Sequence, residues 1–409
     1  MGSMNQNILL NEISKLKSKQ SQWEPFAWYK EMRENSPVFY DAEQDVWNVF
    51  LYEHAKRVLF DHELFSNKKE RSLIPTPSKS FDNRSNVNMV DPPEHRKRRA
   101  LQSQAFTPRS LKEWEPRIQA IVDELIADME GESTLDIMEK LAIPLPVTVI
   151  AELLGVPSKD RRLIKSWSDI LFLPYNKEAF VDIDQQKRQA MKEFRDYLFP
   201  IVQEKRKHPV DDIISDLTKA ELEGEQLTDE EVVMSAIGLL GAGNETTTKL
   251  ISNVFYCILF DKPGIYQELR SDVSLVPNMI EEVLRFRFTA HMDRRVAQDT
   301  NVFGHEMKEG QVIVAWIGSA NRDESEFAHA EEFDIHRPNI QHHLSFGSGP
   351  HFCLGAPLAR MEARIALTAF VKRFADIRPV AGFEVTEHLA DSVLGQSLEN
   401  LPIMVDHNK

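Results

Sequence analysis

The chain has 409 residues, of which 42% are hydrophobic and 28% are charged, and its formal net charge at pH 7 is −15. This acidity argues against nucleic acid as a partner, because binding to phosphates requires a basic surface. No stretch reaches the roughly 18 uninterrupted apolar residues of a membrane span. No signal peptide opens the chain, and its two cysteines cannot build a disulfide framework. We therefore expect a cytoplasmic protein without a membrane span.

Taken in order, the chain predicts a single helix-rich α+β domain with small β-sheets. Residues 1–3 resemble a cloning remnant, which leaves 4–409 as the domain. Residues 1–40 are polar and helical with aromatic anchors, and residues 37–50 alternate as in a β-hairpin. Residues 71–93 are rich in Ser, Asn and Pro without a period, which predicts a long loop of the kind that often forms a lid.

Helices dominate the middle of the chain. The amphipathic segments are 109–130, 135–154, 158–173, 184–207 and 211–222. The strongest helix spans about 229–259, where Thr228 and Glu231 form a capping box. At about 1.5 Å per residue it would extend about 45 Å and cross the whole protein.

The last part of the chain mixes helices and strands. A short helix is predicted at 277–287, strands at 301–320, a helix from Leu354 onward and extended chain at 378–406. No repeat or linker interrupts this pattern, which supports one domain.

The most informative stretch is Phe346–Gly355, FGSGPHFCLG, which places Cys353 in a glycine-rich loop just before a helix. Glycines at 347, 349 and 355 allow positive φ and a close approach to a flat object. The helix dipole and free N–H groups at this position favour the thiolate. One thiolate is too few for zinc, but it is enough for haem iron. A lone cysteine is more often a small buried hydrophobe, and Cys257, in an apolar helical run, fits that description.

The middle of the long helix, residues 238–250 (GLLGAGNETTTKL), departs from helix rules. Gly241 and Gly243 each cost about 1 kcal/mol relative to alanine, and Glu245 and Thr246 are polar where burial is expected. Such departures tend to be functional, and a hydroxyl that bonds back to the preceding turn can bend the helix. The alternative is a glycine patch for close helix packing beside a solvated glutamate.

Two motifs together resemble the cytochrome P450 family, most closely its soluble bacterial members. Residues 346–355 match the haem signature F-G-x-G-x-H-x-C-x-G at every fixed position, and Ala242–Thr246 is similar to the oxygen-activating motif A/G-G-x-D/E-T. The resemblance covers nearly the whole chain. It implies a cytochrome P450 fold, with haem b between the long central helix and the cysteine-loop helix, and with Cys353 as the iron ligand. It also implies O₂ as co-substrate.

The resemblance also implies roles for residues around the haem. Thr246 would hold the oxygen and an ordered water, and Glu245, which replaces the commoner Asp, would relay protons. The haem would be bound by His95, Arg99, Arg294, His351, Phe346, Gly347, Gly355, Ala242 and Gly243. Of these, His95, Arg99, Arg294 and His351 match the propionate partners. Between Arg294 and Arg295, the distance to Asp299 favours Arg294.

A structural ion pair is implied between Glu282 and Arg285, joined by Arg337. The pattern E-x-x-R alone is a weak signal, and surface pairs contribute only about 0–1 kcal/mol. Its place between the Thr246 helix and the Cys353 loop gives it weight. The spacing from Arg337 to Phe346 is a residue longer than usual.

Electrons are expected from NAD(P)H through a ferredoxin or flavodoxin and its reductase, because no flavin or nicotinamide domain is visible in the 409 residues. His95–Arg99 is a basic run in an acidic chain. With His95 and Arg99 turned inward, Arg96, Lys97 and Arg98 would stay exposed and steer an acidic donor, with Arg360 adding to that surface. The alternative explanation of the basic run is a solvated helix face without a partner. We expect a monomer.

The resemblance points to a mostly apolar substrate pocket, which suits a steroid, terpenoid or fatty acid. Its residues would be those of the 71–90 loop with Leu239, Ala242, Thr289, Ala290, Met292, Val393 and Leu394. The expected function is hydroxylation of such hydrophobic small molecules. The alternatives are a peroxide-driven fatty-acid hydroxylase, which typically carries an arginine in place of the acid–alcohol pair, and a non-catalytic haem sensor. A carrier-protein-bound substrate is disfavoured by the acidic surface.

Overall fold

The computed structural model of the protein describes residues 8, 13, 16, 18–69, 71–73, 87–175, 179–395 and 397–408. Residues 1–3, predicted as a cloning remnant, and residues 74–86 of the predicted long loop lie outside this part. Among the described residues, no helix combines the length and apolar character needed to cross a bilayer.

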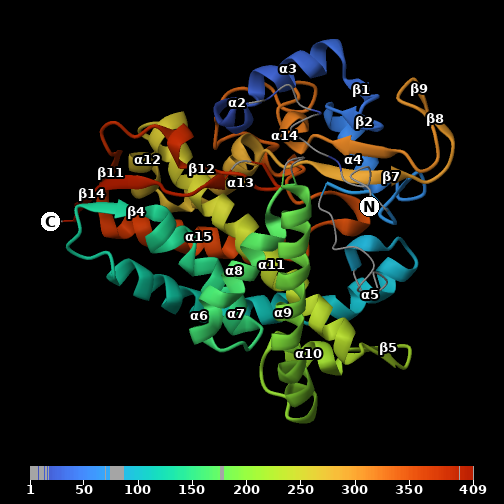
Figure 1. Cartoon of the computed structure of the whole chain (residues 1–409). Helices are drawn as coiled ribbons and strands as arrows, with labels where there is room; N and C mark the ends of the chain where they lie inside the picture. Colours follow the sequence, from blue (N-terminus) through green and yellow to red (C-terminus); the bar gives the residue numbers. More distant parts are fainter. Residues whose placement is uncertain are drawn as a thin grey trace.

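Helices make up most of the molecule and surround one long central helix (Figure 1). Their bounds are α2 Lys19–Trp23, α3 Phe26–Asn35, α4 Tyr52–Phe60, α5 Glu94–Ser103, α6 Pro108–Ala127, α7 Pro144–Leu153, α8 Arg161–Phe172, α9 Phe180–Lys207, α10 Ile213–Lys219, α11 Asp229–Tyr256, α12 Ile265–Ser271, α13 Val276–Arg287, α14 Ile317–Ala320 and α15 Ala356–Arg373.

The central helix α11 is confirmed close to its predicted limits. The Thr228 side chain accepts a hydrogen bond from the Glu231 N–H, and the Glu231 side chain accepts from the Thr228 N–H, which completes the capping box. The helix runs for 28 residues, or about 42 Å, and ends in the π-turn Cys257–Asp261. It packs against α7, α8, α9, α13 and α15, so that its middle is reached from several sides.

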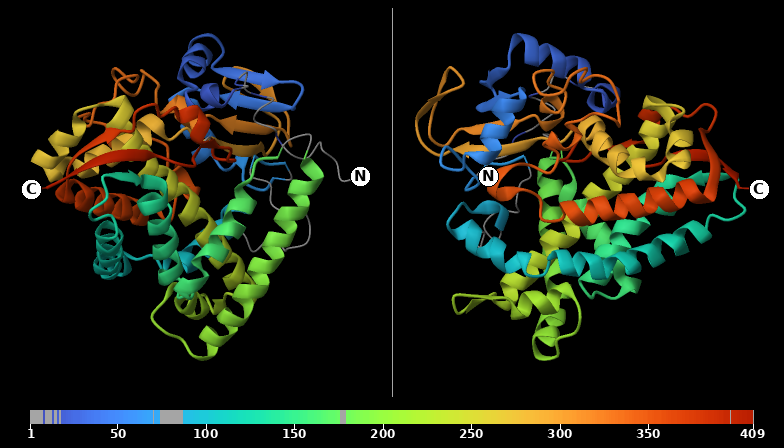
Figure 2. Two further views of the ribbon diagram at one scale, coloured as in Figure 1. Left: turned by 60° about the vertical axis from the view of Figure 1, so that its left-hand side comes forward. Right: turned by 180° about the vertical axis from the view of Figure 1, so that it is seen from behind.

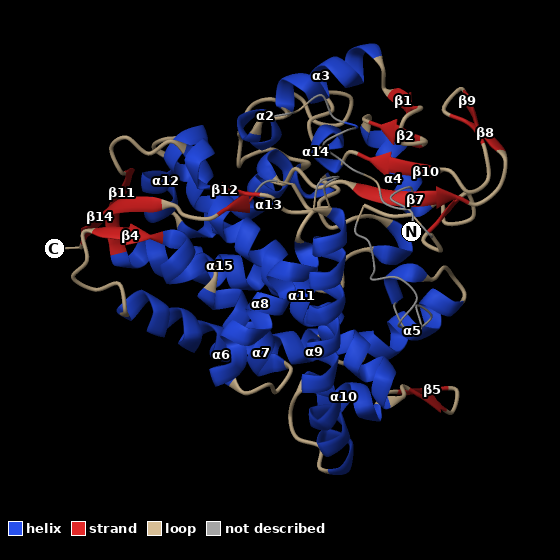
Figure 3. Ribbon diagram, viewed as in Figure 1, coloured by secondary structure: helices blue, strands red, loops and turns tan. Residues whose placement is uncertain are grey.

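Strands form two main groups at opposite sides of the helical body (Figure 3). The larger sheet has the order β1 (Val38–Asp41), β2 (Val46–Val49), β10 (Val312–Ala315), β7 (Met292–Val296) and β3 (Phe65–Ser66), with β2 and β10 parallel. The smaller sheet joins β11 (Phe374–Pro379), β14 (Pro402–His407) and β4 (Thr134–Asp136). Hairpins are formed by β5–β6 (Glu221–Leu222, Glu225–Gln226), β8–β9 (Thr300–Val302, His305–Met307) and β12–β13 (Leu389–Ala390, Ser397–Leu398).

The predicted hairpin at 37–50 is confirmed as β1–β2, whereas the predicted helix at 135–154 is divided. Residues 134–136 form β4 because Met404 and Ile403 of β14 pair with Thr134 and Leu135, a partner far along the chain. A π-turn, Met138–Ala142, follows, and α7 begins only at Pro144, where proline is tolerated in the first helical turn.

Two further boundaries differ from the sequence prediction. The predicted strands at 301–320 end at Ala315, because Ala320 N–H and Asn321 N–H bond back to the carbonyls of Trp316 and Ile317 and close the turn α14. The predicted helix at 211–222 stops at Lys219 and the β5–β6 hairpin follows. The right-hand view of Figure 2 shows α15, in red-orange, running across the near side of the molecule beside α6.

Candidate functional site

The cysteine loop, Phe346–Gly355, contains the 3-10 turn Gly349–His351 and leads into the helix α15. Its glycines Gly347 and Gly349 have φ of 76° and 71°, a conformation that L side chains rarely adopt. A Cβ on Gly349 would lie 2.8 Å from Phe60 Cα, so this position also needs close backbone approach. Gly355 differs from the prediction, since its φ is −80°.

Cys353 is held at the start of α15 by its own backbone. Its N–H donates to Phe346 O at 2.9 Å, and its carbonyl accepts from the Ala356 N–H at 3.4 Å. The residue is exposed, in contrast to Cys257, which is buried in the core. Within the described part of the chain, no three His, Cys, Asp or Glu side chains gather into a metal-binding group. Cys353 would therefore act as a single protein ligand.

The expected preference of Cys353 for the thiolate is not met by the protein alone. Burial raises the pKa of the Cys353 thiol, and the N–H groups of Gly355 and Ala356 with the charges of Arg99 and Arg360 only partly offset it. A thiol that water reaches from one side and protein atoms surround on the others explains both the exposure and the raised pKa. A metal cation bound by the sulfur would replace the proton and remove this penalty.

A cluster of two histidines and two arginines lies beside the cysteine loop, and within the described part of the chain none of the four forms an ion pair with a carboxylate. His95 on α5 is 3% exposed, and its ring centroid lies 3.9 Å from that of His351. Burial lowers the pKa of His95 to about 4, with Arg99 adding to the effect. Burial also lowers the pKa of His351 to about 3, with His95, Arg294 and Arg99 contributing. His351 Nε2 is buried and has no hydrogen-bond partner.

The two arginines of this cluster bond only to backbone carbonyls. Arg99 donates to Phe352 O at 2.6 Å, and Arg294, 6% exposed, donates to Asp293 O at 2.8 Å. The neighbouring Arg295 instead forms an ion pair with Glu309 at 2.9 Å, where both side chains reach solvent. Buried cations and an orphaned imidazole nitrogen fit a group that brings two carboxylates. The residues present thus fit haem and its propionates.

The predicted ion pair supporting the loop is assembled in the interior. Glu282 and Arg285 on α13 have fully buried side chains and form a bidentate pair at 2.6 and 2.7 Å. Arg337 Nε lies 3.7 Å from Glu282 Oε1. Arg285 also donates to the carbonyls of Asn321, Ala330 and Glu332. The structure therefore brings the three predicted residues together and ties them to the segment 321–332.

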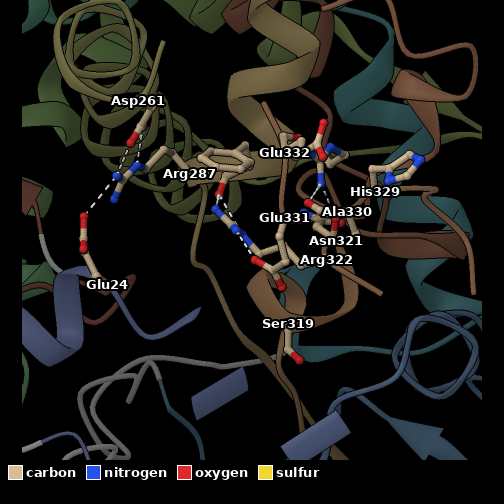
Figure 4. Close-up of polar contacts among 12 residues, drawn as sticks. Glu24, Asp261, Arg287, Ser319, Asn321, Arg322, His329, Ala330, Glu331 and Glu332 are labelled. Carbon is tan, nitrogen blue, oxygen red and sulfur yellow. Dashed lines mark hydrogen bonds and ion pairs between the residues drawn. The ribbon is translucent and has the colours of Figure 1, made fainter. Parts of the chain in front are cut away.

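A further arginine network, missed at the sequence level, is formed by Arg287 and Arg322 with their acidic partners (Figure 4). Arg287 lies between Asp261, whose Oδ2 accepts from its Nε at 2.6 Å, and Glu24 at 3.1 Å. Arg322 pairs with Glu331 at 2.5 Å, and its guanidinium lies over the rings of Phe26 and Phe286 at 3.6 and 3.7 Å. No local signal in the sequence pointed to this network, because aromatic partners such as Phe26 lie far from Arg322 along the chain.

The exposed basic surface predicted for an electron donor is largely neutralised. Arg98 pairs with Glu94 and Glu231 at 2.6 and 2.9 Å, and Lys97 pairs with Glu225 at 2.6 Å. Only Arg96 of the predicted three residues remains exposed without a described ion pair. Glu225 and Glu231 lie more than a hundred residues away in sequence, whereas Glu94 lies four residues before Arg98; these pairings were not anticipated from the sequence, and the donor surface stays a prediction.

Arg360, also predicted for that surface, belongs to a second support network. It donates to both oxygens of Glu281 at 2.6 and 2.8 Å and lies 4.4 Å from the Phe346 ring centroid. His343 Nε2 lies 3.1 Å from Glu281 Oε2. Burial would raise the pKa of Glu281, but the hydrogen bonds from Arg360 and His343 hold it at about 2. Arg360 is thus tied to the loop aromatic rather than free.

On α11, the predicted acid–alcohol pair lies where the helix is open to solvent. Ala242 and Gly238 are exposed in the middle of an otherwise buried helix. Thr246 Oγ1 donates to Ala242 O at 2.5 Å, the back-bond expected from the sequence. The helix nevertheless keeps its α-helical assignment throughout. Burial raises the pKa of Glu245, which Lys249 and a hydrogen bond from Ser392 partly offset, so Glu245 is not the solvated glutamate of the alternative.

The glycines of α11 lie against neighbouring helices. A Cβ on Gly241 would lie 3.4 Å from Phe172 Cε2 of α8, and one on Gly243 would lie 3.4 Å from Ile150 Cγ1 of α7. These distances are close to ordinary van der Waals contact, so packing alone does not require glycine at either position. Ala242, between them, points to the open side.

The predicted substrate residues divide into groups. Thr289 and Val393 line a cavity of about 80 Å³ together with His291, Trp316 and Tyr29, which were not predicted. Leu239, Ala242, Ala290, Met292 and Leu394 do not line it. Met292 lies instead beside the cysteine loop, where its sulfur would be 3.7 Å from a Cβ on Gly347. Of the 71–90 loop, only Leu73 in the described part lines the cavity.

An accessible cysteine at a helix start, arginines beside it that form no ion pair in the described part of the chain, and a long helix that carries an acid–alcohol pair are the features expected of a haem-thiolate protein. Known proteins agree. The family model described as Cytochrome P450 matches residues 3–379. Cytochrome P450(MEG) of Priestia megaterium is 50% identical over 405 residues, which cover 98% of this chain and 99% of that protein. Cytochrome P450(BM-1) of the same species is 47% identical over 408 residues, covering 98% and 100%.

Solved structures give the same result. CYP109E1 from Bacillus megaterium in complex with testosterone has a TM-score of 0.87 and 41% identity, and covers 95% of this chain and 99% of its own. The same protein in complex with corticosterone has a TM-score of 0.83 and 42% identity, covering 94% and 99%. The chain belongs to the cytochrome P450 family, monooxygenases that use haem iron and O₂.

Proposed function

We propose that this protein is an O₂-dependent monooxygenase that hydroxylates hydrophobic small molecules of steroid, terpenoid or fatty-acid type. Its two electrons come from NAD(P)H through a separate ferredoxin or flavodoxin and its reductase. The observation that carries the proposal is the acid–alcohol pair Glu245–Thr246 beside the exposed Ala242 on α11. An enzyme driven by peroxide has no need of proton delivery at this position, and neither has a haem sensor.

The haem is held by groups from four parts of the chain. Cys353 binds the iron. His95, Arg99, Arg294 and His351 bind the propionates, which is supported by the orphaned His351 Nε2 and by Arg294 having only a backbone partner. Arg294 is favoured over Arg295, whose charge is used by Glu309. Phe346, Gly347, Gly355, Ala242 and Gly243 contact the ring. Glu282, Arg285 and Arg337 support the loop. When bound, the haem supplies O₂ binding and cleavage of the O–O bond.

The residues of α11 would deliver protons. Thr246, which donates to Ala242 O, would be free to exchange this hydrogen bond for one to the oxygen and an ordered water. Glu245, whose pKa is raised by burial, passes protons from solvent toward that hydroxyl. A carboxyl with a raised pKa is suited to this, because it keeps a proton to higher pH than an ordinary carboxyl and can pass that proton on.

A steroid is the substrate class with the most direct support. CYP109E1, with 41–42% identity, has been solved with testosterone and with corticosterone. In this chain, Thr289 and Val393 line a cavity of about 80 Å³ with His291 and Trp316, which would form only one part of the larger pocket that a steroid needs. Leu239, Ala242, Ala290, Met292 and Leu394 complete the pocket. We place the enzyme in the cytoplasm as a monomer.

The test compares two ways of driving the holoenzyme on testosterone, corticosterone and a long-chain fatty acid. Binding is followed by the spectral shift that accompanies loss of the iron-bound water. Turnover is measured with O₂ plus a ferredoxin–reductase or flavodoxin–reductase system, and with hydrogen peroxide alone.

We expect a shift with the steroids, and hydroxylated product that matches NAD(P)H consumption. Efficient turnover with peroxide and none with the reductase systems would replace the proposal by the peroxide-driven alternative. Haem retention without product under either condition, across a wider lipid library, would favour a sensor.

A further inference from the structure

Lys249 is a buried lysine on α11 with no part in the roles assigned so far. It lies one helical turn after Glu245 and is 1% exposed. Burial lowers the pKa of Lys249 to about 8, an effect that the Glu245 carboxyl opposes. Lysine is rarely buried this fully unless its ammonium has specific partners.

Those partners belong to the loop at residues 392–395. Lys249 Nζ donates to Leu394 O at 2.7 Å. A Cβ on Gly395 would lie 3.3 Å from Nζ and 3.2 Å from Thr289 Oγ1, and the φ of Gly395 is +89°. The loop therefore passes over the ammonium at a distance that a side chain would obstruct. The Phe288 ring centroid lies 5.7 Å from Nζ on another side.

The same loop is fixed from two other directions. His291 Nε2 lies 2.9 Å from Val393 O, and Val393 N–H donates to Phe172 O, at the end of α8, at 3.2 Å. Within the loop, the Leu394 N–H donates to Ser392 Oγ at 3.2 Å. Lys249 thus joins this loop to α11 through its hydrogen bond to Leu394 O.

The loop carries a group that acts on the acid of α11. A hydrogen bond from the Ser392 side chain lowers the pKa of Glu245. Ser392 and Val393 also line the candidate substrate cavity. One loop therefore contacts the ligand space, Lys249 and the carboxyl assigned to proton delivery.

We propose that Lys249 is a positioning residue, which holds the 392–395 loop against α11 so that Ser392 and the ammonium together set the protonation of Glu245. The inference rests on the proposed monooxygenase function and deepens its proton-delivery step. It assigns Lys249 no contact with substrate or haem.

The sign of the effect follows from the charges that face Glu245. Lys249 on α11 and Lys165 on α8 lower the pKa of Glu245, whereas burial and Asp169 on α8 raise it. His291, packed on the far side of the ammonium, is neutral because burial lowers its pKa to about 4. Loss of the ammonium, and loss of Ser392 with the loop, both raise the pKa of Glu245. The limb of the pH–turnover profile that is set by the ionisation of Glu245 should therefore move to higher pH.

The test uses the haem-loaded protein with Lys249→Met, which keeps the chain length but removes the donor, and Lys249→Arg, which keeps the charge. Lys187→Met is the matched control, because Lys187 is also 1% exposed and donates to a backbone carbonyl, Leu171 O, at 2.9 Å. Two readouts are taken: amide hydrogen exchange of the 391–395 segment, and the pH profile of coupled turnover with Glu245→Gln as reference.

In Lys249→Met we expect about tenfold faster exchange of that segment, a limb moved to higher pH and several-fold less coupled product. Lys249→Arg should restore both readouts, Lys187→Met should leave both unchanged, and Ser392→Ala should move the limb in the same direction. Unchanged exchange overturns the proposal. So does faster exchange with an unmoved limb, since Lys249 would then be merely structural. If the wild type itself forms no O₂-coupled product, the proposed function fails, and the exchange result still decides whether Lys249 holds the loop.

Discussion

The two sides of the candidate haem site are built differently. Behind the cysteine loop, Glu282 and Arg285 are fully buried and bonded to each other, and Arg285 spends its remaining donors on carbonyls of the segment 321–332. On α11, Thr246 bonds to its own helix, and burial raises the pKa of Glu245. On the cysteine side, the hydrogen-bonding groups of Glu282 and Arg285 are already committed to one arrangement. On α11, Thr246 and Glu245 can exchange their present hydrogen bonds for others.

This difference separates holding a cofactor from using it. A network whose donors are all satisfied in the interior has one low-energy arrangement, because any other leaves a buried charge unpaired. A hydroxyl bonded to its own backbone exchanges that bond for a ligand at little cost. Changes on the cysteine side should therefore alter haem binding and stability, and changes on α11 should alter the use of O₂ with the haem retained.

Cys353→Ser should have the largest effect. It removes the sulfur ligand, and with it the electron donation that favours O–O cleavage, so coupled product should fall below detection. The ferrous–CO spectrum should lose the thiolate-type Soret band shown by the wild type, while Cys257→Ser should leave that band in place. A histidine-like band in the wild-type protein would contradict thiolate ligation.

Arg285→Leu should be the most destabilising change that leaves the ligand in place. It leaves the Glu282 carboxylate buried with the Asp334 N–H at 2.8 Å and with Arg337 at 3.7 Å, and breaking a buried pair in this way costs about 3–5 kcal/mol. Denaturant unfolding of the holoprotein measures the loss, and the haem content of purified protein should fall with it. A loss below about 1 kcal/mol would place this pair with ordinary surface pairs.

Thr246→Ala tests the α11 side. The variant should keep its haem and its stability, because alanine favours a helix, but coupled product should fall by about 10²-fold while NAD(P)H consumption continues. Thr248→Ala is a suitable control, since its hydroxyl is buried without a partner. Equal product yields from Thr246→Ala and the wild type would remove the proton-delivery role.

Arg294→Leu and Arg295→Leu compare two adjacent arginines on β7. Loss of a charge-assisted hydrogen bond to a propionate is worth about 1.5–3 kcal/mol, or about 10–100-fold in haem affinity. Arg295 is engaged with Glu309 at the surface, so its loss should matter little. Transfer of haem to an excess of a scavenging protein measures both, and a faster loss from Arg295→Leu would reverse the assignment.

The sequence predicted those parts of the site whose causes are local. The capping box and the apolar period of α11 lie within the helix, and the glycines and cysteine of the loop are contiguous, so their places were predictable. The contacts of Arg98 with Glu231, of Lys249 with Leu394 and of β4 with β14 join residues far apart in sequence. No local pattern encodes these partners, because they are set by the packing of the whole chain.

The smallest predicted effects concern two buried glutamates, Glu281 and Glu362, whose pKa values are shifted in opposite directions. Arg360 and His343 hold the pKa of Glu281 at about 2, so the stability it contributes is present above its ordinary pKa of 4.5 and is lost as the pH falls toward 2. Because Arg360 is partly exposed, we expect Glu281→Gln to cost about 1–2 kcal/mol at neutral pH and nothing near pH 2.

Burial raises the pKa of Glu362, on α15, which has no cationic partner in the described part of the chain. Its ionisation opposes folding as the pH rises, so Glu362→Gln should stabilise the protein at neutral pH and not in acid. Denaturant unfolding at a series of pH values measures both differences. Since Glu281 also fixes Arg360 against Phe346, a Glu281→Gln variant that lost stability equally at every pH would show that packing, rather than charge, joins this network to the cysteine loop.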